Sequence, residues 1–146
     1  MKILENKKVL IIGVANKHSI AAGIAQSMYE AGAEIALTYQ NERLKSNVEK
    51  LGVDWGVETY IECDVSSDDD IEKAFKQLGK KWDFLDTLVH AVGFAPREEL
   101  DGEFVDVTTR EGFKIAHDVS SYSFIALAKA AKPMMQDRNG ALVTLS

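Results

Sequence analysis

A turn between two glycines follows the first apolar run of the chain and opens a helical pattern. Val9–Ile12 leads directly into Gly13, and Ser19, Ile20 and Gly23 follow as the helix begins. The free N–H groups and the dipole of a helix N-terminus attract an anion, so this arrangement favours binding of a dinucleotide pyrophosphate. Gly13 would let the backbone turn close to the ligand, and Gly23 would let the helix pack on the strand.

The turn departs from the common G-x-G-x-x-G pattern, because Ser19 stands where a middle glycine is expected. A glycine turn between a strand and a helix is also compatible with a purely structural role. Lys17 and His18, in the same turn, are more typical of solvated loop residues than of a ligand or a catalytic base.

The residues after the second predicted strand bear on which dinucleotide binds. In such sites an acidic residue contacts the adenosine ribose, whereas an arginine accommodates a 2′-phosphate. Here Gln40 leads the segment, and its neutral amide can hydrogen-bond ribose hydroxyls but cannot neutralise a phosphate. The unphosphorylated cofactor NAD is therefore favoured, while Arg43 leaves the phosphorylated form open.

Two further segments end predicted strands at the same edge of the sheet. Asp64 can accept a hydrogen bond from an adenine amino group and Val65 can pack on the ring, although helix capping and core packing are alternative roles. Gly93 permits close approach of a ligand, and Val92 can pack against it. In an open parallel sheet the ligand binds at the carboxyl ends of the strands, where the strand order reverses, so these residues form one predicted site.

Short apolar strands alternate with amphipathic helices along the chain. Strands are expected at Val9–Ile12, Ile35–Tyr39, Glu58–Cys63, Leu85–His90 and Ala141–Leu145. Helices are expected at Ile20–Met28, Glu42–Leu51, Ser67–Leu78 and Arg110–Lys132. This alternation requires a parallel sheet covered on both faces. The predicted fold is α/β, a doubly wound Rossmann-like sheet of strand order 3-2-1-4-5, within a single dinucleotide-binding domain at residues 1–146.

Two features of the second half follow from local signals. Pro133 is expected to stop the long helix, because a proline removes a helical hydrogen bond and clashes with the preceding turn. Residues 94–109 are expected to form one long irregular connection, and loops of that length at a ligand-binding edge are usually functional.

Composition narrows the range of partners. The net charge of −6, without any basic cluster, gives no electrostatic reason to bind nucleic acid. The single cysteine, Cys63, is expected to be a small buried side chain in a reducing compartment. The acidic run Ser66–Asp70 is expected to cap a helix rather than to bind a metal. No apolar run approaches the roughly 20 residues of a membrane helix, so a cytoplasmic protein without membrane contact is expected.

Taken together, these segments resemble bacterial NADH-dependent enoyl-acyl-carrier-protein reductase, a divergent branch of the short-chain dehydrogenase/reductases. The resemblance covers the whole chain, and it is most specific in Thr108–Phe124. It implies contacts with NAD by Gly13, Ser19, Ile20, Gln40, Asp64, Val65 and Val92, with Gly93 lining the site. It also implies that the backbone at Ala95 lies against the acyl substrate. The family more often has serine at the position of Ala91 and isoleucine at that of Val92.

The resemblance further implies reduction of the trans-2 double bond of enoyl thioesters in fatty-acid biosynthesis, with an acyl-carrier-protein-bound substrate and a homotetramer. A tyrosine and a lysine of the family stabilise the enolate and anchor the ribose. No catalytic residue is expected within this chain, because that tyrosine segment would follow Ser146 directly. We therefore expect residues 1–146 to be the N-terminal portion of a longer protein, with the sheet incomplete after its fifth strand.

Four alternatives stay open. Tyr122 and Lys129 have the separation of a Tyr-x6-Lys pair, although their helix favours a role in packing or in a subunit interface. Asp118 falls where related reductases often have a water-ordering asparagine, but it is equally an ordinary polar helix residue. The protein as a whole could instead reduce ketoacyl thioesters, or the chain could be a non-catalytic nucleotide-binding module.

Overall fold

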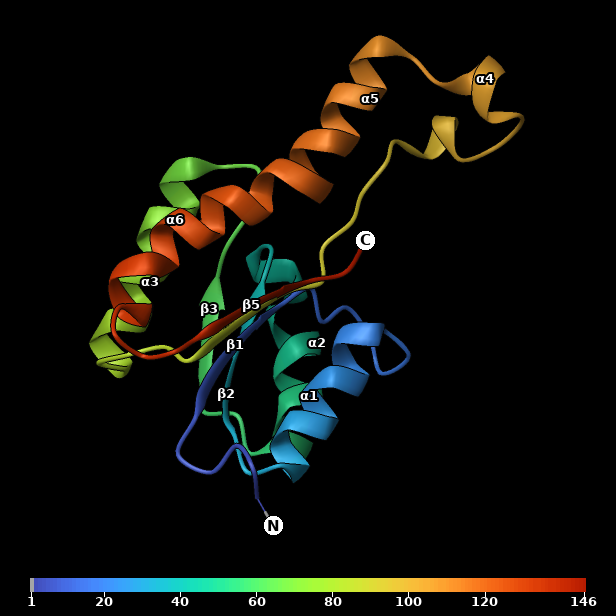
Figure 1. The fold of residues 1–146 in the computed structure, drawn as a ribbon. Coiled ribbons are helices and arrows are strands. Elements are labelled where there is room, and N and C mark those ends of the chain that lie inside the picture. The colour runs from blue at the N-terminus through green and yellow to red at the C-terminus, as the bar shows by residue number, and fades with distance from the viewer. Residues whose placement is uncertain (1) are drawn as a thin grey trace.

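The structure, a computed structural model, describes residues 2–146 as a five-stranded parallel sheet between two layers of helices (Figure 1). The strands are β1 (Lys8–Ile12), β2 (Glu34–Tyr39), β3 (Thr59–Glu62), β4 (Thr87–His90) and β5 (Ala141–Thr144). They are arranged in the order β3-β2-β1-β4-β5, and every neighbouring pair is parallel. The predicted doubly wound α/β fold and its strand order are confirmed.

The helices cover the two faces of this sheet. The longer ones are α1 (Ile20–Glu30), α2 (Glu42–Gly52), α3 (Asp68–Lys81), α5 (Arg110–His117) and α6 (Ser123–Met135). The short ones are α4 (Phe104–Val107), the 3-10 turns η1 (Val53–Trp55) and η2 (Arg97–Glu99), and the π-helical turn η3 (Asp118–Tyr122). Figure 1 shows α1 and α2 on one side of the sheet, α3 and α6 on the other, and α4 and α5 extending beyond its edge.

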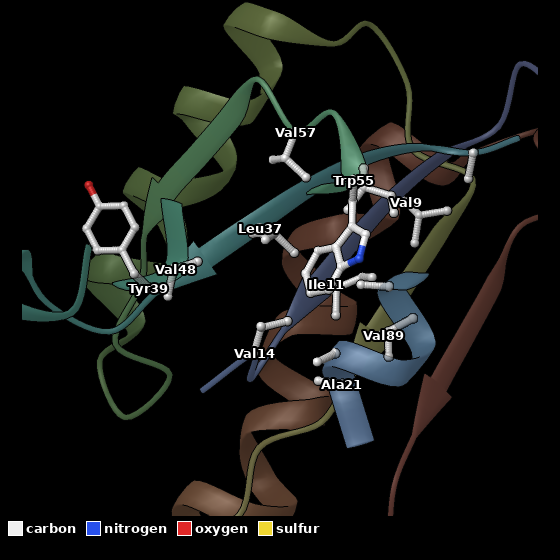
Figure 2. Close-up of a cluster of buried hydrophobic side chains, with 14 residues drawn as sticks. Val9, Ile11, Val14, Ala21, Leu37, Tyr39, Val48, Trp55, Val57 and Val89 are labelled. Atoms are coloured by element: carbon white, nitrogen blue, oxygen red, sulfur yellow. The ribbon is translucent and has the colours of Figure 1, made fainter. Parts of the chain in front are cut away.

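Each face of the sheet has its own apolar core, because successive side chains of a strand point to opposite sides. On the α1–α2 face, Val9 and Ile11 of β1 are fully buried, with Leu37 of the neighbouring β2 beside them. The ring of Trp55 lies next to these strand side chains (Figure 2), and its Nε1 donates to Oε1 of Gln26 at 2.7 Å. The indole thus closes this core without leaving its N–H unpaired.

The opposite core packs between the sheet, α3 and α6. Leu10 and Leu88 from the strands meet Leu78 of α3 and Leu127 of α6, and all four are buried. The continuous apolar run of β1 therefore reflects burial on both faces, as expected of a central parallel strand.

Serine and threonine side chains cap the N-termini of three helices. Ser19 accepts a hydrogen bond from the amide of Ala22, Ser67 from that of Asp70 and Thr109 from that of Gly112. Ser67 lies within the acidic run, whose predicted capping role is confirmed. Each hydroxyl satisfies an amide that has no partner within its own helix.

The predicted long helix after the fourth strand differs in two ways from expectation. It is interrupted by the π-helical turn η3, and it runs through Pro133 to Met135. The expectation that Pro133 stops the helix was wrong. Pro133 lies two residues before the end of α6, so the hydrogen bond that its nitrogen cannot donate is lost only in the last turn. Met134 and Met135 still pack on the second core, and the Met134 carbonyl accepts from the Leu85 amide at 2.9 Å.

The connection at residues 94–109 is less irregular than predicted, since it contains η2 and α4. Glu99 folds it back, because its carboxylate accepts hydrogen bonds from both the amide and the hydroxyl of Thr109. Gly112 makes room for this contact, since a Cβ there would lie 1.8 Å from the Glu99 carboxylate. The negative charge also sits at the N-terminus of α5, where the helix dipole favours it.

Within residues 2–146, no helix is both long and apolar enough to cross a membrane. The same described residues hold no group of three or more His, Cys, Asp or Glu side chains placed to bind a metal ion.

The two glycines of the first turn have different structural roles. Gly13 has a φ of +108°, and a Cβ there would lie 2.1 Å from the carbonyl oxygen of Ala91. A Cβ at Gly23 would meet nothing within 4 Å. The expectation that Gly23 allows the helix to pack on the strand was therefore wrong. Ala21, Ala22 and Ala25 form the buried side of α1, and Gly23 is exposed.

We predict that Gly13→Ala lowers the free energy of unfolding by about 2–4 kcal/mol, because it combines a left-handed backbone with a steric clash. Gly23→Ala is the matched control, and it should be neutral or stabilise by about 0.5–1 kcal/mol, because it replaces a glycine inside a helix. Urea denaturation of both variants measures this difference. Equal stability of the two variants would contradict the close approach of Gly13 to Ala91.

Candidate functional site

A cleft of about 750 Å³ lies at the carboxyl edge of the sheet. It is lined by residues that follow four strands, together with one side of α2, α5 and η3: Ile12–Ala15, Thr38–Gln40, Leu44, Asn47, Val48, Cys63–Ser66, Ala91–Phe94, Glu111, Lys114, Ile115, Asp118 and Val119. Because β1 pairs with both β2 and β4, the strand order reverses at this point. The cleft therefore occupies the position at which open α/β sheets bind their ligands.

Most of the predicted cofactor residues line this cleft. They are Gly13, Gln40, Asp64, Val65, Val92 and Gly93, which come from the ends of four different strands. The fold brings them together although they are spread over 80 residues of sequence. Parallel strands make this possible, since all of their carboxyl ends meet at one edge.

Ser19, Ile20 and Ala95 do not line the cleft. Ser19 holds the turn, since its hydroxyl donates to the Asn16 carbonyl at 2.7 Å and accepts from the Ala22 amide at 3.2 Å. Ile20 has 70% of its surface exposed at the start of α1. Ala95 directly follows Phe94, which does line the cleft. Ligand contacts by these three residues stay predictions.

Asp64 is held as a carboxylate at the end of β3. Its Oδ1 accepts hydrogen bonds from the amide of Ser66 at 2.9 Å and from the Ser66 hydroxyl at 2.6 Å. Partial burial raises the pKa of Asp64. The hydrogen bonds of Ser66, with a smaller contribution from the Gln40 side chain, together outweigh this effect, so the pKa lies below its usual value. The cleft thus presents a negatively charged acceptor at neutral pH, near Gln40, which directly follows β2.

The turn after β1 is anchored by side chains that the sequence reasoning did not single out. Asn47 of α2 donates from Nδ2 to the Ala15 carbonyl at 2.9 Å, and it also lines the cleft. Asn16 accepts from the amide of His18 at 2.8 Å. Lys17 and His18 are exposed and do not line the cleft, in agreement with a solvated role.

One side of α5 and η3 forms a wall that the sequence analysis largely missed. Glu111, Lys114, Ile115 and Asp118 line the cleft, whereas only Asp118 was considered. Their spacing of three and four residues places them on one face of a helix, and this periodicity could have identified them. The wall combines two acids, a lysine and apolar surface.

The alternative catalytic pair is not placed in this cleft. Tyr122 has 48% of its surface exposed, and neither it nor Lys129 lines the cleft. Arg43, the residue that kept a phosphorylated cofactor open, is exposed and is also not part of the lining. Gln40, by contrast, lines the cleft.

Cys63 lies at the base of the cleft, but it is not a nucleophile. Only 4% of its surface is exposed, and burial raises the pKa of its thiol to about 12, with a smaller contribution from Asp70 and Asp64. A thiol with such a pKa is protonated at neutral pH and reacts slowly. The expected role as a small buried side chain is confirmed.

Comparison with protein families places this geometry in context. A family model described as "Enoyl-(Acyl carrier protein) reductase" matches residues 13–146. The chain is 51% identical, over its whole length, to the enoyl-acyl-carrier-protein reductase (NADH) FabI of Escherichia coli strain K12, of which it covers 55%. It is 48% identical to the enzyme of the same name from Aquifex aeolicus, of which it covers 54%. The chain thus spans about half the length of the curated relatives it matches.

Solved structures agree with this result. The crystal structure of the enoyl-acyl-carrier-protein reductase (NADH) from Aquifex aeolicus matches with a TM-score of 0.95 at 48% identity, over 99% of this chain and 57% of the other. The crystal structure of an enoyl-acyl-carrier-protein reductase from Anaplasma phagocytophilum, in complex with NAD, matches with a TM-score of 0.94 at 42% identity, over 99% of this chain and 54% of the other.

We predict that Cys63 in the native chain reacts with iodoacetamide at pH 8 at least about 100-fold more slowly than in the urea-unfolded chain, because burial hides the thiol and keeps it protonated. Mass spectrometry of the alkylated protein over time measures both rates. Unfolded protein serves as the control, since the thiol is then exposed at its ordinary pKa. Similar rates in the two states would show that the base of the cleft opens readily.

Proposed function

The chain belongs to the enoyl-acyl-carrier-protein reductase family, and from this membership we propose that the full-length protein reduces the trans-2 double bond of enoyl thioesters with NADH. The observation that carries the proposal is the cleft at the strand-order reversal, where Gly13, Gln40, Asp64 and the Val92–Gly93 wall meet. Within the chain this site serves binding and orientation. We assign residues 1–146 to a single dinucleotide-binding domain at the N-terminal side of the full-length enzyme.

The residues of the cleft fit a dinucleotide. Gly13 lines the cleft and lets the turn after β1 pass directly against Ala91, and such a glycine turn before a helix favours a pyrophosphate. Gln40 lines the cleft beside Asp64, and its side-chain amide can exchange hydrogen bonds with a ribose hydroxyl. Asp64 can accept from an adenine amino group, and Val65 can pack on the ring. When bound, NADH supplies the hydride for the reaction.

The remainder of the cleft is suited to hold the acyl substrate. Phe94, Ile115 and Val119 add apolar surface, which can exclude water and bind an acyl chain. In this proposal the backbone at Ala95 contacts the substrate, and Ser19 and Ile20 contact the cofactor at the start of α1. In this proposal the enolate is stabilised by the tyrosine and lysine of the family, and the alternative pair, Tyr122 and Lys129, does not line the cleft.

We propose an acyl-carrier-protein-bound enoyl thioester as the substrate and a homotetramer in the cytoplasm as the working form. The family description names the acyl carrier protein and supports the first part. The exposed apolar residues Tyr122 and Ile125, at the junction of η3 and α6, are compatible with a subunit contact. Neither part requires a nucleic acid or a membrane.

The first test is activity. We predict that the purified full-length protein oxidises NADH in the presence of crotonyl thioester, whereas residues 1–146 alone do not turn over. Loss of a preorganised oxyanion donor alone costs about 100-fold to 1000-fold in kcat, and residues 1–146 cover only about half of the length of the curated relatives. NADH absorbance follows the reaction, with a 3-ketoacyl thioester as the comparison substrate. Oxidation of NADH with the ketoacyl thioester alone would assign the protein to ketoacyl reduction instead.

The second test concerns the cofactor. We predict that Gln40→Arg reduces the NADH-over-NADPH ratio of kcat/KM by about tenfold or more, because a guanidinium can bind the 2′-phosphate and Gln40 cannot. Arg43→Gln is the matched control, and it should leave the ratio unchanged, because Arg43 does not line the cleft. If Arg43→Gln changes the ratio and Gln40→Arg does not, Arg43 governs the choice of cofactor.

A further inference from the structure

His90 is a buried polar residue beside the cleft to which no role has yet been given. It ends β4 and has no exposed surface, and the cleft-lining segment Ala91–Phe94 follows it directly. Its Nδ1 lies 2.9 Å from Oγ1 of Thr144 on β5, and its Nε2 lies 2.7 Å from the buried Oγ of Ser123 on α6. Burial lowers the pKa of the His90 imidazole, which favours the neutral ring.

The direction of these hydrogen bonds follows from the single proton of each hydroxyl. The Ser123 hydroxyl donates to the carbonyl oxygen of Val119 at 2.6 Å, because a carbonyl can only accept. It must therefore accept from Nε2–H of His90. In a neutral ring Nδ1 then carries no proton and accepts from the Thr144 hydroxyl. The bonds run in one direction, from Thr144 through His90 and Ser123 to Val119.

The bond from the Ser123 hydroxyl to the Val119 carbonyl accompanies the π-helical turn. In an α-helix the amide of Ser123 would bond to the carbonyl of Val119, four residues earlier. In η3 that amide instead donates to the carbonyl of Asp118. The Ser123 side chain thus bonds to the carbonyl that its own amide would contact in an α-helix, and it ties the residue directly after the π turn to Val119.

The π turn in turn shapes one end of the cleft. Asp118 and Val119 line the cleft, and the Ser120 hydroxyl accepts from the amide of Phe94 at 3.0 Å and donates to its carbonyl at 3.2 Å. Phe94 also lines the cleft, next to Ala95. Gln40 and Asp64 lie at the ends of β2 and β3, on the other side of β1 from β4.

We propose that His90 is a positioning residue that, through Ser123 and with Thr144, holds the π turn Asp118–Tyr122 against β4 and so fixes the wall that binds the acyl substrate. This inference rests on the proposed enoyl reduction, and it adds a determinant of substrate binding that does not itself touch the substrate. Displacing Val119 and Phe94 should weaken substrate binding while the adenosine end of the cleft keeps its shape.

The experiment compares four variants of the full-length protein. Ser123→Ala and His90→Leu each remove one member of the hydrogen-bond series from Thr144 to Val119. His90→Gln retains a donor for Ser123, and Ser121→Ala is the control, because Ser121 is exposed on the same turn. For Ser123→Ala and His90→Leu we expect a rise of about tenfold in KM for crotonyl thioester, with the dissociation constant of NADH changed by less than about twofold. His90→Gln should lie between His90→Leu and the unmodified protein, and Ser121→Ala should match the latter.

Two further readouts keep this inference separate from the proposed function. Hydrogen exchange at the amides of residues 118–124 and of Phe94 should accelerate in Ser123→Ala and not in Ser121→Ala. Nitrogen chemical shifts of labelled His90 should show a proton on Nε2 and none on Nδ1. Lack of enoyl reduction by the unmodified protein would refute the proposed function, and these two measurements would still decide the positioning role.

An unchanged KM for the thioester in Ser123→Ala would overturn the inference, even if that variant were less stable. A parallel loss of NADH and thioester affinity would also overturn it, because that result indicates general disruption of the cleft. A proton on Nδ1 in place of Nε2 would reverse the direction of the bonds and remove their basis.

Discussion

The close approach of the turn after β1 to the end of β4 is the constraint on which the cleft depends. The Ala91 amide donates to the Ile12 carbonyl at 2.9 Å, and Gly13 then passes the Ala91 carbonyl too closely for any side chain. This contact brings the two strands on either side of the order reversal together at their carboxyl ends. The turn after β1 and the Val92–Gly93 wall consequently line the same cleft.

At the amino edge of the sheet, the buried carboxylate of Asp86 holds neighbouring strands together. Asp86, with 4% of its surface exposed, accepts from the amide of Lys8 at 2.9 Å and pairs with Arg138 at 3.1 Å. Its carbonyl accepts from the amide of Ala141, so β1, β4 and β5 are all tied to one residue. A buried carboxylate is tolerated only when it is paired and hydrogen-bonded, as here. The strands are therefore joined at the amino edge, and the carboxyl edge is left for ligands.

Sequence reasoning succeeded where local pattern and sheet geometry determine the result, and it failed where side chains compete with the backbone. The strands and their order follow from apolar runs that alternate with helices, and Gln40, Asp64 and Gly93 follow because they end those strands. The π turn was missed because it depends on the Ser123 hydroxyl, whose partner His90 lies 33 residues away. The predicted helix end at Pro133 was wrong because Met134 and Met135 pack on the second core, and this packing keeps the last residues of α6 helical.

The two kinds of contact meet at the end of β4, at His90 and at Ala91, which directly follows the strand. The Ala91 amide bonds to Ile12 of β1 beside the turn that follows it, whereas the His90 side chain reaches across to Ser123 of α6 at the end of the π turn. Ala91 acts through its backbone and His90 through its side chain, so one dipeptide contacts both β1 and α6. A shift of β4 by one residue would place Ala91 where the hydrogen-bonding ring of His90 is required. The register of β4 therefore links the turn after β1 to the π turn at the other end of the cleft.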